Sequence, residues 1–246
     1  MAAPAPVDWL AEIDSTNAEA RRRAEAGERG PVWISALRQT AGRGRRGRVW
    51  DTGEGNLAAT LLFQTDKAPG EAAQLSFVAA LAVADLAQAF VPPSLVSLKW
   101  PNDPLIFGRK ASGILIESGQ HPLGGLWVAV GVGVNLAHAP KLADRPTTSF
   151  ADHMSQPPPT PQAALDILAR AFAHWEGVWH REGFAPIARA WTSRAHGLGE
   201  PCVARLPDET VQGIAEGLDI DGALRLRQPD GTIRRITAGD VYFGGA

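Results

Sequence analysis

The chain contains the apolar run Leu126-Trp-Val-Ala-Val-Gly-Val-Gly-Val-Asn135. Its apolar, β-branched run predicts a buried strand over residues 126–134. Gly131 and Gly133 stand two positions apart, so they leave one face of that strand bare, where a flat or extended ligand could lie. A bulge or tight packing would explain the same pair of glycines without any ligand.

Similar apolar runs predict further strands around this one, and longer periodic segments predict helices. The predicted strands of this part of the chain cover residues 7–13, 32–37, 57–63, 95–100 and 112–117. The predicted helices cover residues 16–26, 72–90, 162–181 and 184–194, and a Pro-rich loop is expected over 139–161. Thr16 and Glu19 have the spacing of a capping box, which supports a helix start at Thr16.

The pattern changes near Gly197, where we place a domain boundary. Short predicted strands then follow over residues 202–206, 210–218, 223–227 and 232–237. Turn signals such as Asp221-Gly222 separate them, which is typical of a small barrel.

Composition excludes several classes of protein. The chain has 246 residues, 45% of them hydrophobic, which is a globular rather than a disordered balance. The net charge of −2 argues against a basic nucleic-acid footprint, and the lone Cys202 excludes a disulfide framework and a cysteine-rich zinc site. The most apolar long stretch, residues 77–90, is too short to span a membrane, and no signal peptide is evident. We therefore expect a cytoplasmic protein with no membrane partner.

The segment Arg38-Gln-Thr-Ala-Gly-Arg-Gly-Arg-Arg-Gly-Arg48, called the arginine loop below, carries five arginines and three glycines without an acid. Glycines let backbone N–H groups approach an anion, and guanidinium groups bind phosphate with two hydrogen bonds. We expect no regular element here and an anion for the loop to wrap. A nucleic-acid patch or a solvated loop are the alternatives, although aromatic residues are not interleaved with the arginines.

A second polar segment is Lys99-Trp-Pro-Asn-Asp103. A strand that ends at Pro101 would expose Asn102 and Asp103 at a chain reversal, where a carboxylate can hold hydrated Mg²⁺. A plain Asx turn is the alternative. Lys110 precedes the next strand, a position where a lone lysine is usually a surface residue.

Taken together, five segments in this order resemble the motifs of the biotin protein ligases. They are Ile13-Asp-Ser-Thr-Asn17, Gln39-Thr-Ala-Gly-Arg-Gly-Arg-Arg-Gly-Arg48, Lys99-Trp-Pro-Asn-Asp103, Arg109-Lys-Ala-Ser-Gly-Ile114 and Gly131-Val-Gly-Val-Asn135. The resemblance covers about residues 7–243. It implies an α/β catalytic domain over residues 1–197, with a mixed sheet flanked by helices, and an SH3-like barrel over residues 198–246.

The resemblance also implies an activity. Such enzymes use ATP and Mg²⁺ to convert biotin into biotinyl-5′-AMP, and then transfer biotin to a lysine of a biotin carboxyl carrier protein. A lipoate–protein ligase shares the fold family but lacks an arginine loop of this form, and is the nearest alternative. No winged-helix domain fits before Ser15, so we expect no specific DNA target, and a homodimer is left open.

Carried over motif by motif, the resemblance implies roles for individual residues. The implied catalytic residues are Lys110 and Arg43. The residues implied to bind biotin are Ser15, Thr16, Asn17, Gln39, Gly42, Arg43, Gly44, Arg45, Lys110, Gly131 and Gly133. Those implied to bind ATP and the adenylate are Arg45, Arg46, Arg48, Trp50, Asn102, Asp103, Lys110, Val134 and Asn135. Asp103 is the implied Mg²⁺ ligand, and Pro104 departs from the apolar residue, such as leucine, that is usual in the family.

Overall fold

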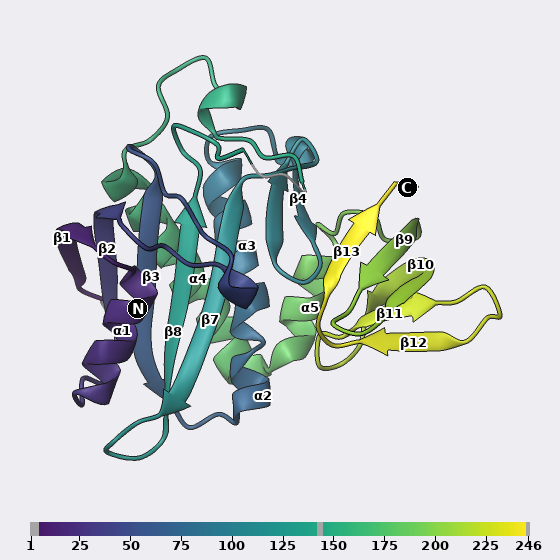
Figure 1. Ribbon diagram of the computed structural model, residues 1–246, viewed down its shortest axis with the longest axis horizontal. Helices are drawn as coiled ribbons and strands as arrows, with labels where there is room; N and C mark the ends of the chain where they lie inside the picture. Colours follow the sequence, from purple (N-terminus) through teal and green to yellow (C-terminus); the bar gives the residue numbers. More distant parts are fainter. Residues whose placement is uncertain (1–4, 142–144, 245–246) are drawn as a thin grey trace.

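The main body of the molecule is a five-stranded mixed sheet in the order β1-β2-β3-β8-β7 (Figure 1). This computed structural model describes residues 5–141 and 145–244. The strands are β1 (Val7–Ile13), β2 (Val32–Gln39), β3 (Leu57–Thr65), β7 (Ser112–Gln120) and β8 (Leu126–Val134). β1 and β2 run parallel and the other neighbours antiparallel, so the expected mixed sheet is confirmed.

Helices cover both faces of this sheet. α3 (Leu75–Gln88) and α4 (Pro161–Glu182) pack on one face, and α1 (Thr16–Glu25) on the other. Alternate residues of β8 therefore serve two cores: Val128 and Val130 join the larger one, whereas Ala129 packs with Ala20 and Ala24 of α1. Gly131 and Gly133 continue the alternation of Ala129, so they lie on the α1 face.

One helix prediction needs correction and another is confirmed. The expected helix over 72–90 is divided into α2 (Pro69–Ala72) and α3, whereas α1 begins at Thr16 as predicted, with Ser15 rather than Thr16 as its cap. Ser15 is the extended residue, and its hydroxyl accepts a hydrogen bond from the Ala18 amide. Residues 142–144 of the expected loop over 139–161 lie outside the described residues, and its described part contains the short 3₁₀ turn Ala151–His153. α5 (Phe184–Thr192) follows α4.

The segment Pro69–Gln88 passes a length and composition test for a membrane span, which the shorter range 77–90 did not suggest. However, 67% of its apolar window is buried inside the structure. Because α3 packs against α4 and α5, the segment has the environment of a core helix.

A small three-stranded sheet carries the Lys99-to-Asp103 motif, and sequence reasoning missed two of its strands. Its order is β4 (Val96–Lys99), β5 (Asp103–Ile106) and β6 (Arg109–Lys110), after a 3₁₀ turn over Pro93–Leu95. Pro104 fits into β5 opposite Leu98, and its carbonyl accepts a hydrogen bond from the Ala111 amide. The departure at Pro104 therefore preserves the reversal that positions Asn102 and Asp103.

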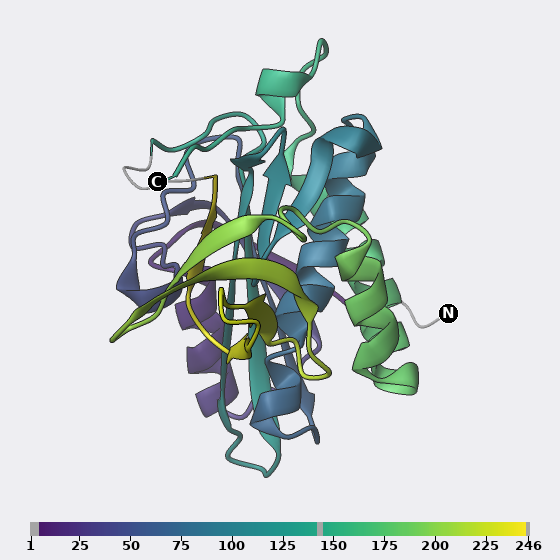
Figure 2. The ribbon, with the colours of Figure 1, turned by 90° about the vertical axis from the view of Figure 1, so that its right-hand side faces the viewer.

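The end of the chain forms a separate five-stranded antiparallel sheet beside α5 (Figures 1 and 2). Its order is β12 (Ile233–Ile236), β11 (Leu224–Arg227), β10 (Thr210–Leu218), β9 (Pro201–Arg205) and β13 (Asp240–Phe243). The expected all-β part is confirmed, although β13 was not predicted. Hydrogen bonds join this sheet to the main body, among them those that Trp100 donates to the Gly222 carbonyl and Lys99 to the Val241 carbonyl, at 3.0 and 3.2 Å. β13 is thereby held next to the Lys99 motif.

Candidate active site

The turn into α1 forms the polar end of a cavity. Thr16 donates its backbone amide and its hydroxyl to Oε1 of Gln39, at 2.8 and 3.1 Å. Gln39 in turn donates to Thr52, and the buried Thr60 hydroxyl lies 2.8 Å from that of Thr16. Ser15, Thr16 and Gln39 therefore converge on one cavity wall. Thr60 was missed because a lone threonine in an apolar strand gives no signal of its partners.

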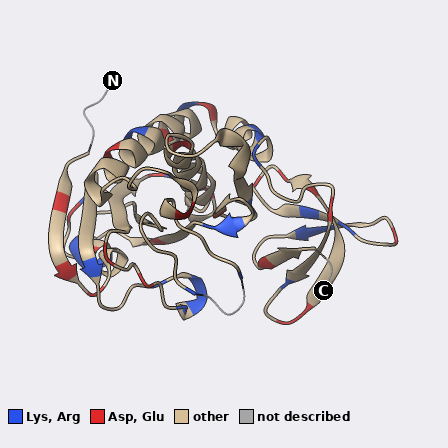
Figure 3. Ribbon diagram, turned by 90° about the horizontal axis from the view of Figure 1, so that it is seen from above, with Lys and Arg blue, Asp and Glu red and all other residues tan. Residues whose placement is uncertain are grey.

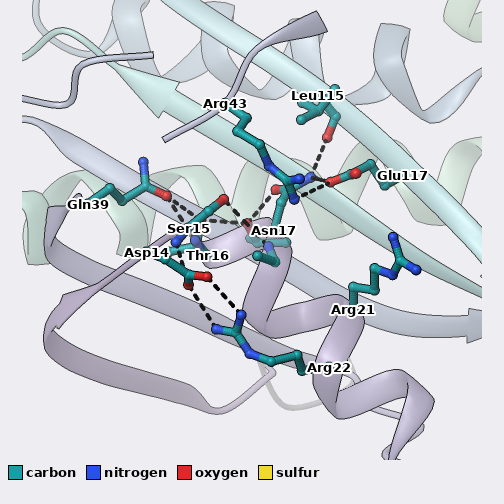
Figure 4. Close-up of polar contacts among 12 residues, drawn as sticks. Asp14, Ser15, Thr16, Asn17, Arg21, Arg22, Gln39, Arg43, Leu115 and Glu117 are labelled. Carbon is teal, nitrogen blue, oxygen red and sulfur yellow. Dashed lines mark hydrogen bonds and ion pairs between the residues drawn. The ribbon is translucent and has the colours of Figure 1, made fainter. Parts of the chain in front are cut away.

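Asp14 fixes this turn from outside the cavity (Figure 4). It accepts the Ser15 amide at 2.7 Å and two hydrogen bonds from Arg22, each 2.8 Å. The hydrogen bonds from Arg22 lower the pKa of Asp14 to about 2. The carboxylate stays charged at neutral pH and keeps the Ser15 and Thr16 side of the turn in place.

Asn17 lines the same cavity, but its amide is already paired with protein groups. Its Oδ1 lies 2.7 Å from the Thr60 hydroxyl, and its Nδ2 donates to Glu117 at 2.8 Å. A Cβ atom at Gly131 would collide with this amide. Glu117 also lies 3.9 Å from Arg43 (Figure 4), so Asn17 pairs with an acid that in turn contacts the arginine loop, and sequence reasoning missed this acid.

Glycines form the floor of the cavity. Gly131 and Gly133 of β8 and Gly113 of β7 line it, and the Trp50 indole lies against the last two. Tight packing, the alternative explanation of these glycines, therefore holds in this structure. Trp50 packs on the sheet, whereas the resemblance implied packing against the arginine loop.

The arginine loop is more regular than its composition predicts. Hydrogen bonds between Trp50 and Gly42 and between Gly44 and Arg48 close its base, and a 3₁₀ turn occupies Arg45–Gly47. Arg46 adopts the left-handed φ of 57° at the tip. The expectation of no regular element is therefore wrong.

Three cations surround Asp103 at the other end of the cavity. Its carboxylate contacts Lys110 Nζ, Lys99 Nζ at 3.1 Å and Arg145 Nη1 at 3.3 Å. Burial alone would raise the pKa of Asp103, but Lys110, Lys99 and Arg145 together hold it well below its usual range. Asp103 is thus a permanent anion that positions Lys110, which lines the cavity. Arg145 lies in the expected loop, where no pattern marked it.

The expectation that Asp103 binds Mg²⁺ does not fit this geometry. Its side chain is only 3% exposed and three cations already contact it, so a divalent cation there would meet strong repulsion. Within residues 5–141 and 145–244, no group of three or more His, Cys, Asp or Glu side chains could hold a metal ion.

Asp240, at the start of β13, is a second acid that sequence reasoning missed. Its carboxylate lies 3.3 Å from Arg45, 3.5 Å from Arg46 and 2.8 Å from Arg48. Figure 3 shows basic segments, in blue, on both the main body and the neighbouring C-terminal strands. Three arginines of the loop thus contact a carboxylate of the chain itself.

Most of the predicted site residues share one cavity. They are Ser15, Thr16, Asn17, Gln39, Arg43, Gly44, Arg45, Arg48, Trp50, Asn102, Asp103, Lys110, Gly131 and Gly133. The other four do not line it. Gly42 lies against the Gln39 side-chain amide, and Arg46 contacts Asp240. Val134 faces the main core because it alternates with Gly133. Asn135 is buried and donates to the Thr148 carbonyl, while its Oδ1 has no partner among the described residues.

The arrangement separates three chemical functions along one cavity: hydrogen-bonding groups at the α1 turn, a glycine floor, and cations at Lys110 and Arg45. It suits an elongated molecule with a polar ring at one end and an anionic group at the other.

Comparison with known proteins gives two family matches. Residues 10–135 match the model of the Biotin/lipoate A/B protein ligase family, and residues 197–244 match that of the Biotin protein ligase C terminal domain.

Whole-chain comparisons agree. The chain is 47% identical to a biotin–[acetyl-CoA-carboxylase] ligase of Paracoccus denitrificans, over 96% of this chain and 100% of that protein. A ligase of the same name from Mycobacterium tuberculosis is 34% identical, over 96% of this chain and 88% of its own length. A biotin protein ligase from Aquifex aeolicus, solved in complex with biotin and ATP, has a TM-score of 0.83 at 24% identity. That match covers 97% of this chain and 99% of the other, and shows that the fold is shared.

Proposed function

The chain belongs to the biotin protein ligase family of enzymes, and from that premise we propose that it activates biotin with ATP and attaches it to a lysine of a carrier protein. The single observation that carries this proposal is the order of groups along the cavity. Hydrogen-bonding groups lie at one end, the strand backbone in the middle, and a buried lysine at the other end.

Biotin would bind with its ureido ring at the α1 turn. Ser15, Thr16 and Gln39 supply donors and acceptors, and the Thr52 and Thr60 hydroxyls hold Gln39 and Thr16 in position. Because an analogue without the ureido group would leave these groups unpaired, such a wall can discriminate strongly. The valeryl chain would then follow the glycine floor toward Lys110.

The first chemical step joins two anions. The biotin carboxylate oxygen attacks the α-phosphorus of ATP, the bond to the β-phosphate oxygen breaks, and pyrophosphate leaves. Lys110 lines the cavity where these anions would meet, and Arg43 lies at its rim. Their positive charges would stabilise the transition state, in which negative charge is concentrated. Magnesium would arrive with ATP as part of the substrate.

The second step transfers the biotinyl group. The amine of a carrier lysine attacks the acyl carbon and AMP leaves, so the mixed anhydride must be kept from water until then. The arginine loop, closed at its base by the Trp50–Gly42 hydrogen bond, would cover the adenylate. The names of the relatives point to a biotin carboxyl carrier of acetyl-CoA carboxylase as the acceptor. We also propose a domain division near residue 197. We further propose a cytoplasmic location, which the lone buried Cys202 supports.

The test is release of pyrophosphate from ATP, measured with biotin, with lipoate and with neither. We expect release only with biotin, followed by labelling of a carrier domain at its acceptor lysine. Release with lipoate alone would assign the chain to the lipoate branch and refute the proposal.

A further inference from the structure

Asp240 brings the C-terminal sheet into contact with the arginine loop. It lies 192 to 195 residues along the chain from its partners Arg45, Arg46 and Arg48, yet one carboxylate contacts all three. A fourth guanidinium, that of Arg145, lies 3.9 Å away and also contacts Asp103. Arg145 therefore links Asp240 to Asp103, the carboxylate that positions Lys110.

Several cations gather around two carboxylates in this region. Among the described residues, two carboxylates, Asp103 and Asp240, face two lysines and four arginines. Asp240 is only 6% exposed at its side chain. Burial would raise its pKa, but Arg48, followed by Arg145 and Arg45, holds the pKa below its usual range, so it is charged at neutral pH.

Resting on the proposed function, we infer that Asp240 is a resident counter-ion of the polyphosphate site, which ATP must displace from the arginine loop. A guanidinium offers the same planar donor faces to a carboxylate and to a phosphate. Arg45 and Arg48 line the cavity and contact Asp240 at the same time, so they stand between the two anions. A triphosphate carries several negative charges against one on Asp240, and would compete for these arginines.

Two consequences follow from such an exchange. Without nucleotide, Asp240 keeps like-charged arginines together and the loop in place over the cavity. When the phosphates take these arginines, β13 loses its ion pairs to the loop, so nucleotide binding is coupled to the C-terminal sheet. Asp240 is in this sense a positioning residue that acts through the arginines.

A purely structural role for Asp240 predicts the opposite change in polyphosphate affinity when the carboxylate is removed. If the carboxylate only props the loop open to ATP, its removal weakens polyphosphate binding. If it competes, its removal tightens binding. Asp240→Asn keeps the shape of the side chain and removes the charge, so it separates the two cases.

The experiment measures binding of inorganic tripolyphosphate to the full-length protein by titration calorimetry. We expect the Kd of Asp240→Asn to fall by roughly fivefold or more, about 1 kcal/mol, because competing ion pairs are lost. Asp240→Glu should bind close to the wild-type Kd. The matched control is Glu209→Gln, which removes an acid of the turn between β9 and β10 whose partner is the exposed Arg234. Its Kd should not change.

A second measurement uses the wild-type protein alone. Saturating tripolyphosphate should speed hydrogen exchange at residues 240–243, because β13 loses contacts. A Kd for Asp240→Asn that is unchanged or higher would overturn the inference, as would exchange in β13 that tripolyphosphate leaves unaltered. Since neither readout involves biotin, failure of the proposed ligase activity would be recognised separately, by the absence of biotin-dependent pyrophosphate release.

Discussion

Lys110 and Lys99 offer a matched pair of substitutions for testing the proposed catalytic lysine. Both ammonium groups contact the Asp103 carboxylate and both side chains are largely buried. Only Lys110 lines the cavity, whereas Lys99 also donates to the Val241 carbonyl. Lys110→Met and Lys99→Met therefore remove the same charge from the same carboxylate, but at different places relative to substrate.

The two variants should lose similar stability. Removing one partner of a buried ion pair costs about 3–5 kcal/mol, and we expect about 3 here because Asp103 keeps two other cations. For a chain of this length, that corresponds to a fall in Tm of roughly 6–12 °C. Thermal melts should show both variants folded at 20 °C, with comparable shifts.

Activity should separate them. Loss of one charge that stabilises the transition state costs about 3–4 kcal/mol, or roughly a hundred- to a thousandfold in rate. We expect this loss in biotin-dependent pyrophosphate release for Lys110→Met, with a smaller change in biotin Kd, and a mild effect for Lys99→Met. Lys110→Arg should rescue only in part, since a planar fork cannot take the position of an ammonium group. Equal losses in the two Met variants would mean that Lys110 acts only through Asp103, and the assignment would be wrong.

Other predictions concern the floor, the thiol and the loop. Gly131→Ala should weaken biotin binding by about tenfold or more, because the added methyl group displaces the Asn17 amide, whereas Gly70→Ala meets open space and should bind normally; equal biotin affinities would contradict this reasoning. Burial raises the pKa of Cys202 to about 11, so at pH 8 iodoacetamide should label the native protein far more slowly than the unfolded chain, and equal rates would show an accessible thiol. Arg43→Ala should release biotinyl-adenylate and label a lysine-rich bystander protein more than wild type does, and equal labelling at equal adenylate formation would count against a covering role for the loop.

Long periodic segments were predictable from the sequence, and short ones were not. β1 and β8 have the bounds that were predicted, because nine or seven residues with a clear pattern specify a strand. β5 and β6 have four and two residues, too few for any period to show. Their hairpin depends on partners instead, such as β4 and the segment near Thr147.

The site divides in a similar way. Residues that belong to compact motifs, such as Thr16, Arg45 and Lys110, could be predicted to lie in one site because their neighbours in sequence mark them. Arg145 and Asp240 stand alone in their surroundings, and only the fold brings them to the motifs. A lone charged residue is usually a solvated one, so no reading of the sequence could have selected these two.

The positions of the two acids follow from the electrostatic demand of the chemistry. A site that joins a carboxylate to a phosphate needs several cations, yet cations gathered without anions would repel one another in the ligand-free protein. Asp103 compensates the charge of Lys110. It lies seven residues away in sequence, in the β5–β6 hairpin, so Lys110 stays fixed in place. Asp240 compensates the charges of the arginine loop from a separate sheet. The guanidinium groups that it contacts are one-third to one-half exposed. In the proposed reaction the first contact would persist, because Lys110 would hold its position. The second would be exchanged, because the loop would admit and release its ligand.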